Sequence, residues 1–143
     1  MKILISVLLI LHGLIVAGQA AGSFGSTIPK EIQNPIFVSW WPINMGRSWV
    51  FSLIGLEKTL TVYRIGGLLW LAGGIALVAA GLGILGFIVP THWWRELAIA
   101  GGAISLLMLA IYFHPLTIIG TASSMAVLVA LLWARWPSPT LVP

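Results

Sequence analysis

One histidine, His12, stands in the middle of the apolar run LLILHGLIVAG at residues 8–18. An ionisable side chain at the centre of a hydrocarbon-length segment indicates a functional group with a partner. Gln19 follows seven residues later and shares a helical face with His12. Two interpretations stay open: a neutral His12 hydrogen-bonds within a polar seam, or His12 and Gln19 contact a lipophilic molecule, a quinone or a pigment.

The polar seam would be built from hydroxyl groups of later apolar segments. Burial disfavours a charged imidazole and makes an unpaired polar group costly, so the hydrogen-bonded interpretation is the preferred one. In the ligand interpretation, His12 would hold one side of a pigment or haem, as a proximal histidine does. The hydroxyl groups available to such a seam belong to Ser105, Tyr112, Thr117, Thr121 and Ser124.

Residue types needed for metal binding or catalysis are scarce. The other two histidines, His92 and His114, fall in predicted loops at opposite faces, each roughly 15 Å from His12 in a hydrocarbon core of about 30 Å. Zinc needs nitrogen ligands at about 2.0 to 2.1 Å, so one chain cannot gather the three around a metal. There is no cysteine, which excludes disulfides and thiolate metal sites.

Side-chain carboxylates are few and none falls in a predicted span, which leaves no intramembrane proton relay and no paired acid and base. We therefore expect no metal, no catalytic residues, no enzymatic activity and no cofactor, except in the ligand alternative. The three side-chain carboxylates are Glu31, Glu57 and Glu96.

The amino-acid composition indicates what kind of secondary-structure elements carry His12 and the other polar residues. Of 143 residues, 59% are hydrophobic and 7% are charged, too few charges to cover a water-soluble globule. Four segments without Lys, Arg, Asp or Glu satisfy the length of a spanning helix. The predicted fold is therefore an all-α integral membrane bundle of four transmembrane helices, forming a single domain over 1–143. The predicted spans are residues 3–21, 65–89, 97–113 and 116–134.

The N-terminal segment has a second interpretation. Residues 1–20 carry a basic residue, an apolar stretch and small residues near Gly18 and Ala20, a pattern that also fits a cleaved signal peptide. A retained helix is preferred because the apolar stretch is as long as a span. Loop charges do not decide the orientation, and the signal-like start favours both termini in the cytoplasm of a multi-pass inner-membrane protein. Trp93, Trp94, Trp133 and Trp136 would then form one belt at the inner face.

Small residues recur along every predicted span, which predicts close helix packing. In the second span, six small residues at sevenfold spacing are expected to share one broad face: Gly66, Gly67, Gly73, Gly74, Ala80 and Gly81. Packing within the bundle is preferred over pairing with a partner. The other ridges are Gly13, Ala17 and Ala21 in the first span, Ala98 and Gly102 in the third, and Ala122, Ala126, Ala130 and Ala134 in the last.

The outer segment, residues 22–64, is too apolar for an ordinary solvated loop. Its residues 48–56 predict a short interfacial helix with a cap near Asn44. A lid over the bundle's own outer end and the headgroups is the preferred role, and the alternatives are a docking surface for a partner subunit or the entrance to a lipophilic site. Candidate partner-binding residues are Trp40, Trp41, Trp49 and Phe51.

The layout of four helices, a long first loop and the residues "LHG" at 11–13 resembles the small DoxX-like bacterial membrane proteins. That resemblance implies a four-helix fold and, from some relatives, an association with quinone-linked oxidoreductases. A Lys that tends to follow the His-Gly pair in those proteins is replaced here by the apolar Ile15, Val16 and Ala17. Only His12 is carried over, as a candidate residue.

Two functions follow as hypotheses. The first is a non-enzymatic accessory or structural subunit that packs against membrane partners or forms a homo-oligomer. The second is a binder of a lipophilic molecule, quinone or pigment, associated with a membrane redox system. The bilayer is a partner in both. The net charge of +4 comes from scattered basic residues without a cluster, so nucleic acid is not an expected partner.

Overall fold

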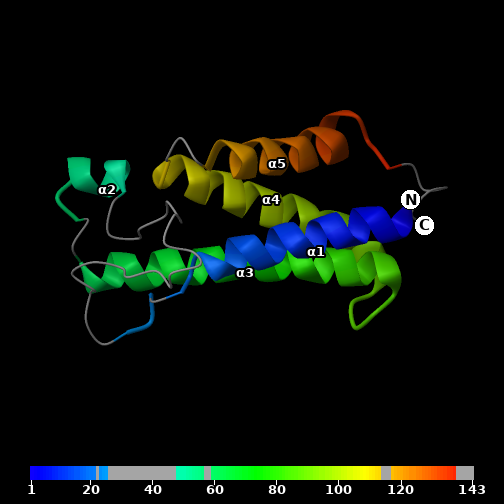
Figure 1. The fold of residues 1–143 in the computed structure, drawn as a ribbon, viewed down its shortest axis with the longest axis horizontal. Coiled ribbons are helices and arrows are strands. Elements are labelled where there is room, and N and C mark those ends of the chain that lie inside the picture. Colours follow the sequence, from blue (N-terminus) through cyan, green and yellow to red (C-terminus); the bar gives the residue numbers. More distant parts are fainter. Residues whose placement is uncertain (22, 26–47, 57–58, 114–116, 138–143) are drawn as a thin grey trace.

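The computed structural model describes residues 1–21, 23–25, 48–56, 59–113 and 117–137, and this part of the chain contains helices and no strand. Four long helices and one short helix follow each other along the chain (Figure 1). They are α1 (Lys2–Gly18), α2 (Trp49–Leu53), α3 (Leu60–Leu85), α4 (Trp94–Ile111) and α5 (Ile118–Leu128), the last continued by a π-helical turn, Val129–Trp133. The all-α prediction is confirmed for the described residues.

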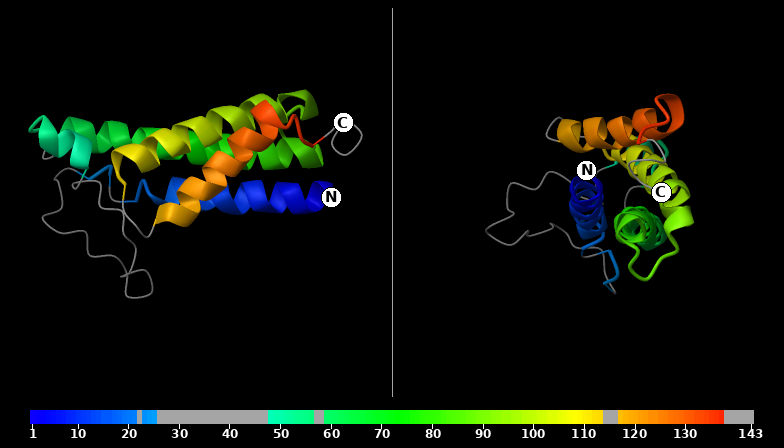
Figure 2. Two further views of the ribbon diagram at one scale, coloured as in Figure 1. Left: turned by 90° about the horizontal axis from the view of Figure 1, so that it is seen from above. Right: turned by 90° about the vertical axis from the view of Figure 1, so that its right-hand side faces the viewer.

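The four long helices run alternately up and down. Figure 2 shows α3 beside both α1 and α4, with α5 lying obliquely across α4. Met1, the turn between α3 and α4, and the end of α5 lie together at what we call the basal end. The opposite, apical end carries α2, the start of α3 and the end of α4 (Figure 1).

α1 and α3 pack through glycine contacts along most of α1. A Cβ on Gly13 would lie 2.7 Å from the Gly74 carbonyl oxygen, and one on Gly81 would lie 2.8 Å from the Ser6 carbonyl oxygen. Real Cβ atoms do not approach backbone so closely, so only glycine permits this helix separation. The predicted packing of the first ridge within the bundle is confirmed for Gly13 and Ala17, whereas Ala21 lies beyond the end of α1 and is exposed.

A second glycine face of α3 is turned toward α4. A Cβ on Gly101 would lie 2.8 Å from the Gly73 carbonyl oxygen, and one on Gly73 would lie 3.1 Å from Ile104. All six small residues of the predicted broad face of α3 are buried, and this face meets two neighbouring helices. Adjacent residues on a helix are about 100° apart, so the pair Gly73 and Gly74 serves two different neighbours.

The boundaries of α3 and α4 differ from the predicted spans. α3 begins at Leu60, where Thr59 Oγ1 accepts a hydrogen bond from Val62 N at 3.4 Å. It ends at Gly86, whose φ of 75° is the left-handed conformation that stops helices. α4 is preceded by a 3-10 turn, Thr91–Trp93. The sequence pattern shows how long each apolar segment is, whereas the capping residues determine where each helix begins and ends.

Two helices, Leu60–Leu85 and the continuous Thr91–Ile111, are long and apolar enough to cross a membrane. α1 and the helix Ile118–Trp133 are apolar but shorter. The described chain thus contains two candidate membrane spans.

α5 is the least covered of the long helices. Of residues Ile118–Leu128 only Ser124 is buried, and Leu131 is the one buried residue of the following π turn. The ridge predicted to pack inside the bundle has Ala122 and Ala126 exposed, so for this helix the prediction of internal packing is wrong. The buried side of α5 is instead determined by Ser124.

The short α2 helix lies on the apical end of α4. Its cap is Ser48, which accepts a hydrogen bond from Phe51 N at 3.2 Å and donates one to the Ile111 carbonyl at 2.8 Å. The Trp49 indole donates to the Ala110 carbonyl at 2.7 Å. The predicted short helix is confirmed, but its cap is Ser48, and Asn44 lies outside the described residues. Two orphan carbonyls at the end of α4 are thereby paired.

Candidate functional site

His12 lies in a chain of three hydrogen-bonding side chains that joins three helices. Its Nε2 is 3.0 Å from Ser124 Oγ, and Ser124 donates to Ser105 Oγ at 3.0 Å. Both serines are fully buried, and His12 is half-buried. The Ser124 hydroxyl can accept one of these hydrogen bonds while it donates the other, so it links the imidazole to Ser105.

Glycine packing brings these residues together. Gly13 holds α1 against α3, which places the neighbouring His12 on the adjacent side of α1. A Cβ on Gly102 would lie 3.4 Å from the Leu128 side chain, so this glycine lets α5 approach α4 one turn from Ser105. The polar chain therefore lies where α5 crosses toward α1, at about the middle of each helix.

The structure selects among the predicted members of the polar seam. Ser124 hydrogen-bonds to His12 directly, and Ser105 is linked to His12 through Ser124, as the preferred interpretation requires. Thr121 donates instead to the Thr117 carbonyl of its own helix at 3.1 Å. Thr121 therefore bonds within α5 and is no bridge to His12.

Gln19 lies near the apical end of α1 and is buried. Its Nε2 donates to the Ile15 carbonyl at 3.3 Å. Seven residues of helix separate it from His12 by about 10 Å along the axis, so the two side chains do not form one contact point. Their role as contacts for a lipophilic ligand stays a prediction.

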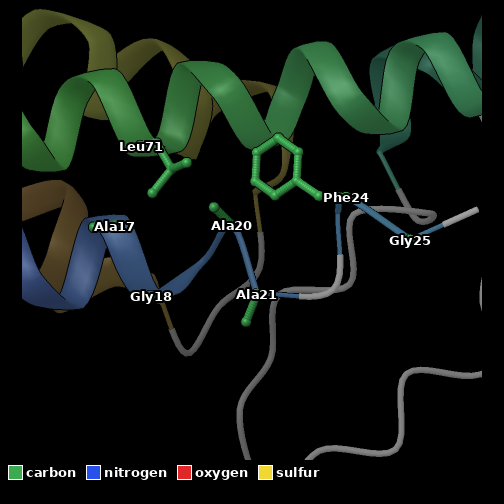
Figure 3. Close-up of a pocket in the computed structure, with 7 residues that line it drawn as sticks. All are labelled: Ala17, Gly18, Ala20, Ala21, Phe24, Gly25 and Leu71. Carbon is green, nitrogen blue, oxygen red and sulfur yellow. The ribbon is translucent and has the colours of Figure 1, made fainter.

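An apolar cleft lies on the surface at the end of α1, and its lining includes the sequence neighbours of Gln19 but not Gln19 itself. It has a volume of about 560 Å³ and lies between the end of α1 and the middle of α3 (Figure 3). Phe24 lies over α3 on one side of the cleft, and Leu71 faces the α1 end (Figure 3). The lining residues are Ala17, Gly18, Ala20, Ala21, Phe24, Gly25 and Leu71.

The apical end holds a group of polar aromatic residues that the sequence interpretation missed or assigned elsewhere. Tyr63, Trp70 and Tyr112 are buried, and within the described part of the chain their hydroxyl and indole N–H groups have no hydrogen-bond partner. Tyr112 was expected in the His12 seam, but its ring contacts Trp70 and Phe51. The sevenfold spacing of Tyr63 and Trp70 on one helix face was the signal that could have found the group.

The candidate partner-binding residues have different surroundings. Trp49 is 55% exposed although its indole is hydrogen-bonded, whereas Phe51 is half-buried with its ring centroid 6.2 Å from that of Tyr112. Part of the Phe51 surface is thus already used within the chain. Trp40 and Trp41 lie outside the described residues.

Of the four tryptophans predicted to form a belt at one face, three are exposed near the basal end: Trp93, Trp133 and Trp136. Trp94 is the exception, because it belongs to the buried core with 6% of its surface exposed. Arg95, next to it, donates to the Leu131 carbonyl in the π turn. The basal end therefore carries exposed indoles, together with an arginine that hydrogen-bonds to a carbonyl near the end of α5.

Among the described residues no three His, Cys, Asp or Glu side chains lie close enough together to hold a metal ion. The His12 chain can hold helices in register and orient an imidazole, and the Ser124 hydroxyl within it is wholly enclosed. In comparisons with known proteins, no family model, no curated protein and no solved structure matches this chain.

Proposed function

We propose that this chain is a four-span integral protein of the bacterial inner membrane that serves as a non-enzymatic accessory or structural subunit. The observation that carries the membrane placement is the distribution of its side chains. Serines are buried between helices, while large apolar side chains are exposed along all four long helices, for example Leu11, Leu68, Leu107 and Ile119. Such a surface suits hydrocarbon and not water.

The support for four spans rather than two is how far the shorter helices extend beside the longer ones. Contacts between α1 and α3 run from Ser6 against Gly81 to Ala17 against Gly74, and Ser23, after the end of α1, lies against Gly67. Contacts between α5 and α4 run from Gly120 against Leu109 to Leu131 against Arg95. If α3 and α4 cross a bilayer, α1 and α5 cross it with them.

The basal end is proposed to face the cytoplasm. Exposed indoles of Trp93, Trp133 and Trp136 suit the membrane–water interface, and Lys2 and Arg135 lie at the same end. Because four is an even number of spans, the start of α1 and the end of α5 would both lie on the cytoplasmic side.

The subunit role rests on α5. This helix is covered on one side only, and its open side carries Ala122 and Ala126, one turn apart, among apolar side chains. In lipid, small residues in such a row favour close approach of another helix. We assign this open side as the surface that packs against a partner subunit or a second copy.

The assignment is tested by purification from the native membrane in mild detergent, with the size and protein content of the complex as readout. Ala126→Ile should reduce the recovered complex because it fills the α5 row, while the bundle itself stays folded. Ala72→Ile on the exposed side of α3 is the matched control and should leave the complex intact. Equal loss in both variants, or a monomer in the wild type, would contradict the subunit role.

The second candidate is a binder of a lipophilic molecule through His12 and Gln19. The observation that favours it is the apolar cleft at the end of α1, large enough for a ring or acyl chain and lined by Gly18 and Ala20, the sequence neighbours of Gln19 (Figure 3). Under this function, His12→Leu removes a bound quinone or pigment from the purified protein without changing its assembly. Under the subunit function, His12→Leu lowers stability alone.

A further inference from the structure

The turn between α3 and α4 exposes two large apolar side chains next to each other. It has the sequence GFIVP at residues 86–90, in which Phe87 is 61% exposed and Ile88 is 93% exposed. Turns that face water are normally built from polar residues together with Gly and Pro. Two adjacent apolar side chains left in water would be unfavourable, so this turn suits contact with an apolar phase.

The backbone of the turn is strained at the residue that is most exposed. Phe87 N donates to the Leu82 carbonyl at 2.9 Å and closes the end of α3. Val89 N donates to the Phe87 carbonyl at 2.6 Å, which makes a γ-turn centred on Ile88. Ile88 has a φ of 63°, a conformation that β-branched residues rarely adopt. Strain of this kind is typical of segments with a function.

The base of the turn is packed against the bundle. A Cβ on Gly83 would lie 3.5 Å from Val89 Cγ1, 3.7 Å from the Pro90 carbonyl oxygen and 3.4 Å from Trp94 Cβ. The residues that follow Ile88 therefore lie against the last turn of α3, next to the start of α4. Ile88 itself stays outside this packing, so the bundle holds the tip of the turn in an exposed position.

The turn points sideways from the bundle. Both views show the segment between α3 and α4 projecting from the end of α3 on the side away from α5, and not continuing along the helix axis (Figure 1, Figure 2). For helices that cross a bilayer, an axial projection would enter the cytoplasm. A sideways projection instead keeps the turn in the layer where α3 ends.

The charges of α3 indicate where that layer lies. Arg64 is exposed near the apical start of α3, and no Lys, Arg, Asp or Glu occurs between Arg64 and Arg95. From Arg64 to Leu85 the helix rises by about 32 Å, close to the hydrocarbon thickness of about 30 Å. With Arg64 at the apical headgroups, Leu85 and the turn after it lie at the basal edge of the hydrocarbon.

We propose that Phe87 and Ile88 insert into the basal leaflet of the membrane, so that the turn anchors the α3–α4 hairpin in lipid. The partner is the boundary between acyl chains and headgroups, where apolar side chains without charge are stable. This inference rests on the proposed spanning of α3 and α4. It does not depend on the packing of α5 or on a ligand at His12.

Spin labels measure the depth of the turn. The chain has no cysteine, so Phe87→Cys and Ile88→Cys can each carry a single nitroxide in phosphatidylcholine–phosphatidylglycerol vesicles. Electron paramagnetic resonance then compares accessibility to oxygen, which enters lipid, with accessibility to a water-soluble nickel chelate. Leu68→Cys, exposed in the middle of α3, is the reference for lipid, and Lys2→Cys, exposed at the basal start of α1, is the reference for water.

Labels at positions 87 and 88 should be accessible to oxygen and several-fold less accessible to nickel than the label at position 2. Nickel access equal to that at position 2, with the label at position 68 still protected, would overturn the anchor and leave the spans intact. Nickel access at position 68 as well would contradict the spans and, with them, the anchor.

A second substitution tests whether Ile88 drives the insertion. Ile88→Asn removes the apolar side chain but keeps a residue that tolerates positive φ, and Ile88→Val is the matched apolar control. With the label at position 87, nickel access should rise in Ile88→Asn and stay low in Ile88→Val. Unchanged access in Ile88→Asn would overturn the role of Ile88 in the anchor.

Photo-crosslinking in native membranes distinguishes lipid from a protein partner. Benzoylphenylalanine in place of Ile88 should give crosslinks to lipid alone. A discrete crosslinked protein species from this position would show that a protein covers the tip, which would overturn the proposal.

Discussion

Gly13 and Gly74 face each other so closely that a Cβ on either would collide with the backbone of the other. A Cβ on Gly13 would lie 2.7 Å from Gly74 O, and one on Gly74 would lie 2.5 Å from Gly13 O. This reciprocal contact sets the separation of α1 and α3. It also fixes the position of His12, the neighbour of Gly13, relative to the rest of the bundle.

Gly74→Ala should therefore separate the two helices. The added methyl group meets backbone atoms, which cannot rotate away, so we expect a loss of about 1 to 3 kcal/mol in the free energy of unfolding. Thermal unfolding in detergent measures it. Gly18→Ala is the matched control, because nothing lies within 4 Å of its Cβ position. Equal effects of the two substitutions would show that the α1–α3 contact is not close.

Ser124→Ala should destabilise the bundle more than the neighbouring Ser123→Ala. Ser124 bonds to both His12 and Ser105, so its loss leaves two polar groups on other helices without a partner, at a cost of about 1 to 3 kcal/mol. Ser123 donates only to the Ile119 carbonyl within α5. Unfolding of both variants in the same detergent compares them. A smaller loss of stability in Ser124→Ala than in Ser123→Ala would show that the hydrogen bonds between His12, Ser124 and Ser105 do not stabilise the helix packing.

Ser48→Ala should loosen α2 without unfolding the bundle. The hydroxyl both caps α2 and donates to Ile111, and loss of a cap costs about 1 kcal/mol. Faster amide hydrogen exchange restricted to residues 49–56 is the expected result. Leu53→Ala, in a side chain that is 77% exposed, is the control and should leave exchange unchanged. Protection that persists in Ser48→Ala would mean that other contacts hold α2.

Arg95→Leu should destabilise the π turn at the end of α5. The guanidinium donates to the Leu131 carbonyl, which lies in the π turn. Without it that carbonyl loses a charge-assisted hydrogen bond, and amide exchange in residues 129–136 should increase. Arg64→Leu, on the exposed surface of α3, is the control for the loss of a positive charge. Unchanged exchange in Arg95→Leu would show that the π turn is stable on its own.

The number and type of the long helices were predictable from the sequence, because apolar length alone indicates them. The polar seam was predictable in part. Ser105 and Ser124 were among its candidates, but periodicity cannot say which hydroxyl of α5 faces His12, since that depends on the oblique crossing of α5.

Other features were beyond the sequence pattern for physical reasons. The glycines of α3 divide between two neighbours because α3 lies between α1 and α4, which only the tertiary arrangement reveals. The Ala122 and Ala126 row has the same spacing as the buried ridges, yet it is exposed. Small-residue spacing predicts that a helix can pack closely, and it does not say against what.

The central claim is that the open side of α5 packs against another protein in the membrane. Photo-crosslinking in native membranes tests it most directly, with benzoylphenylalanine placed at Ala126 and, as the control, at the exposed Ala72 of α3. We predict a discrete crosslinked protein species from position 126 and none from position 72. Crosslinks to lipid alone at both positions would contradict the claim.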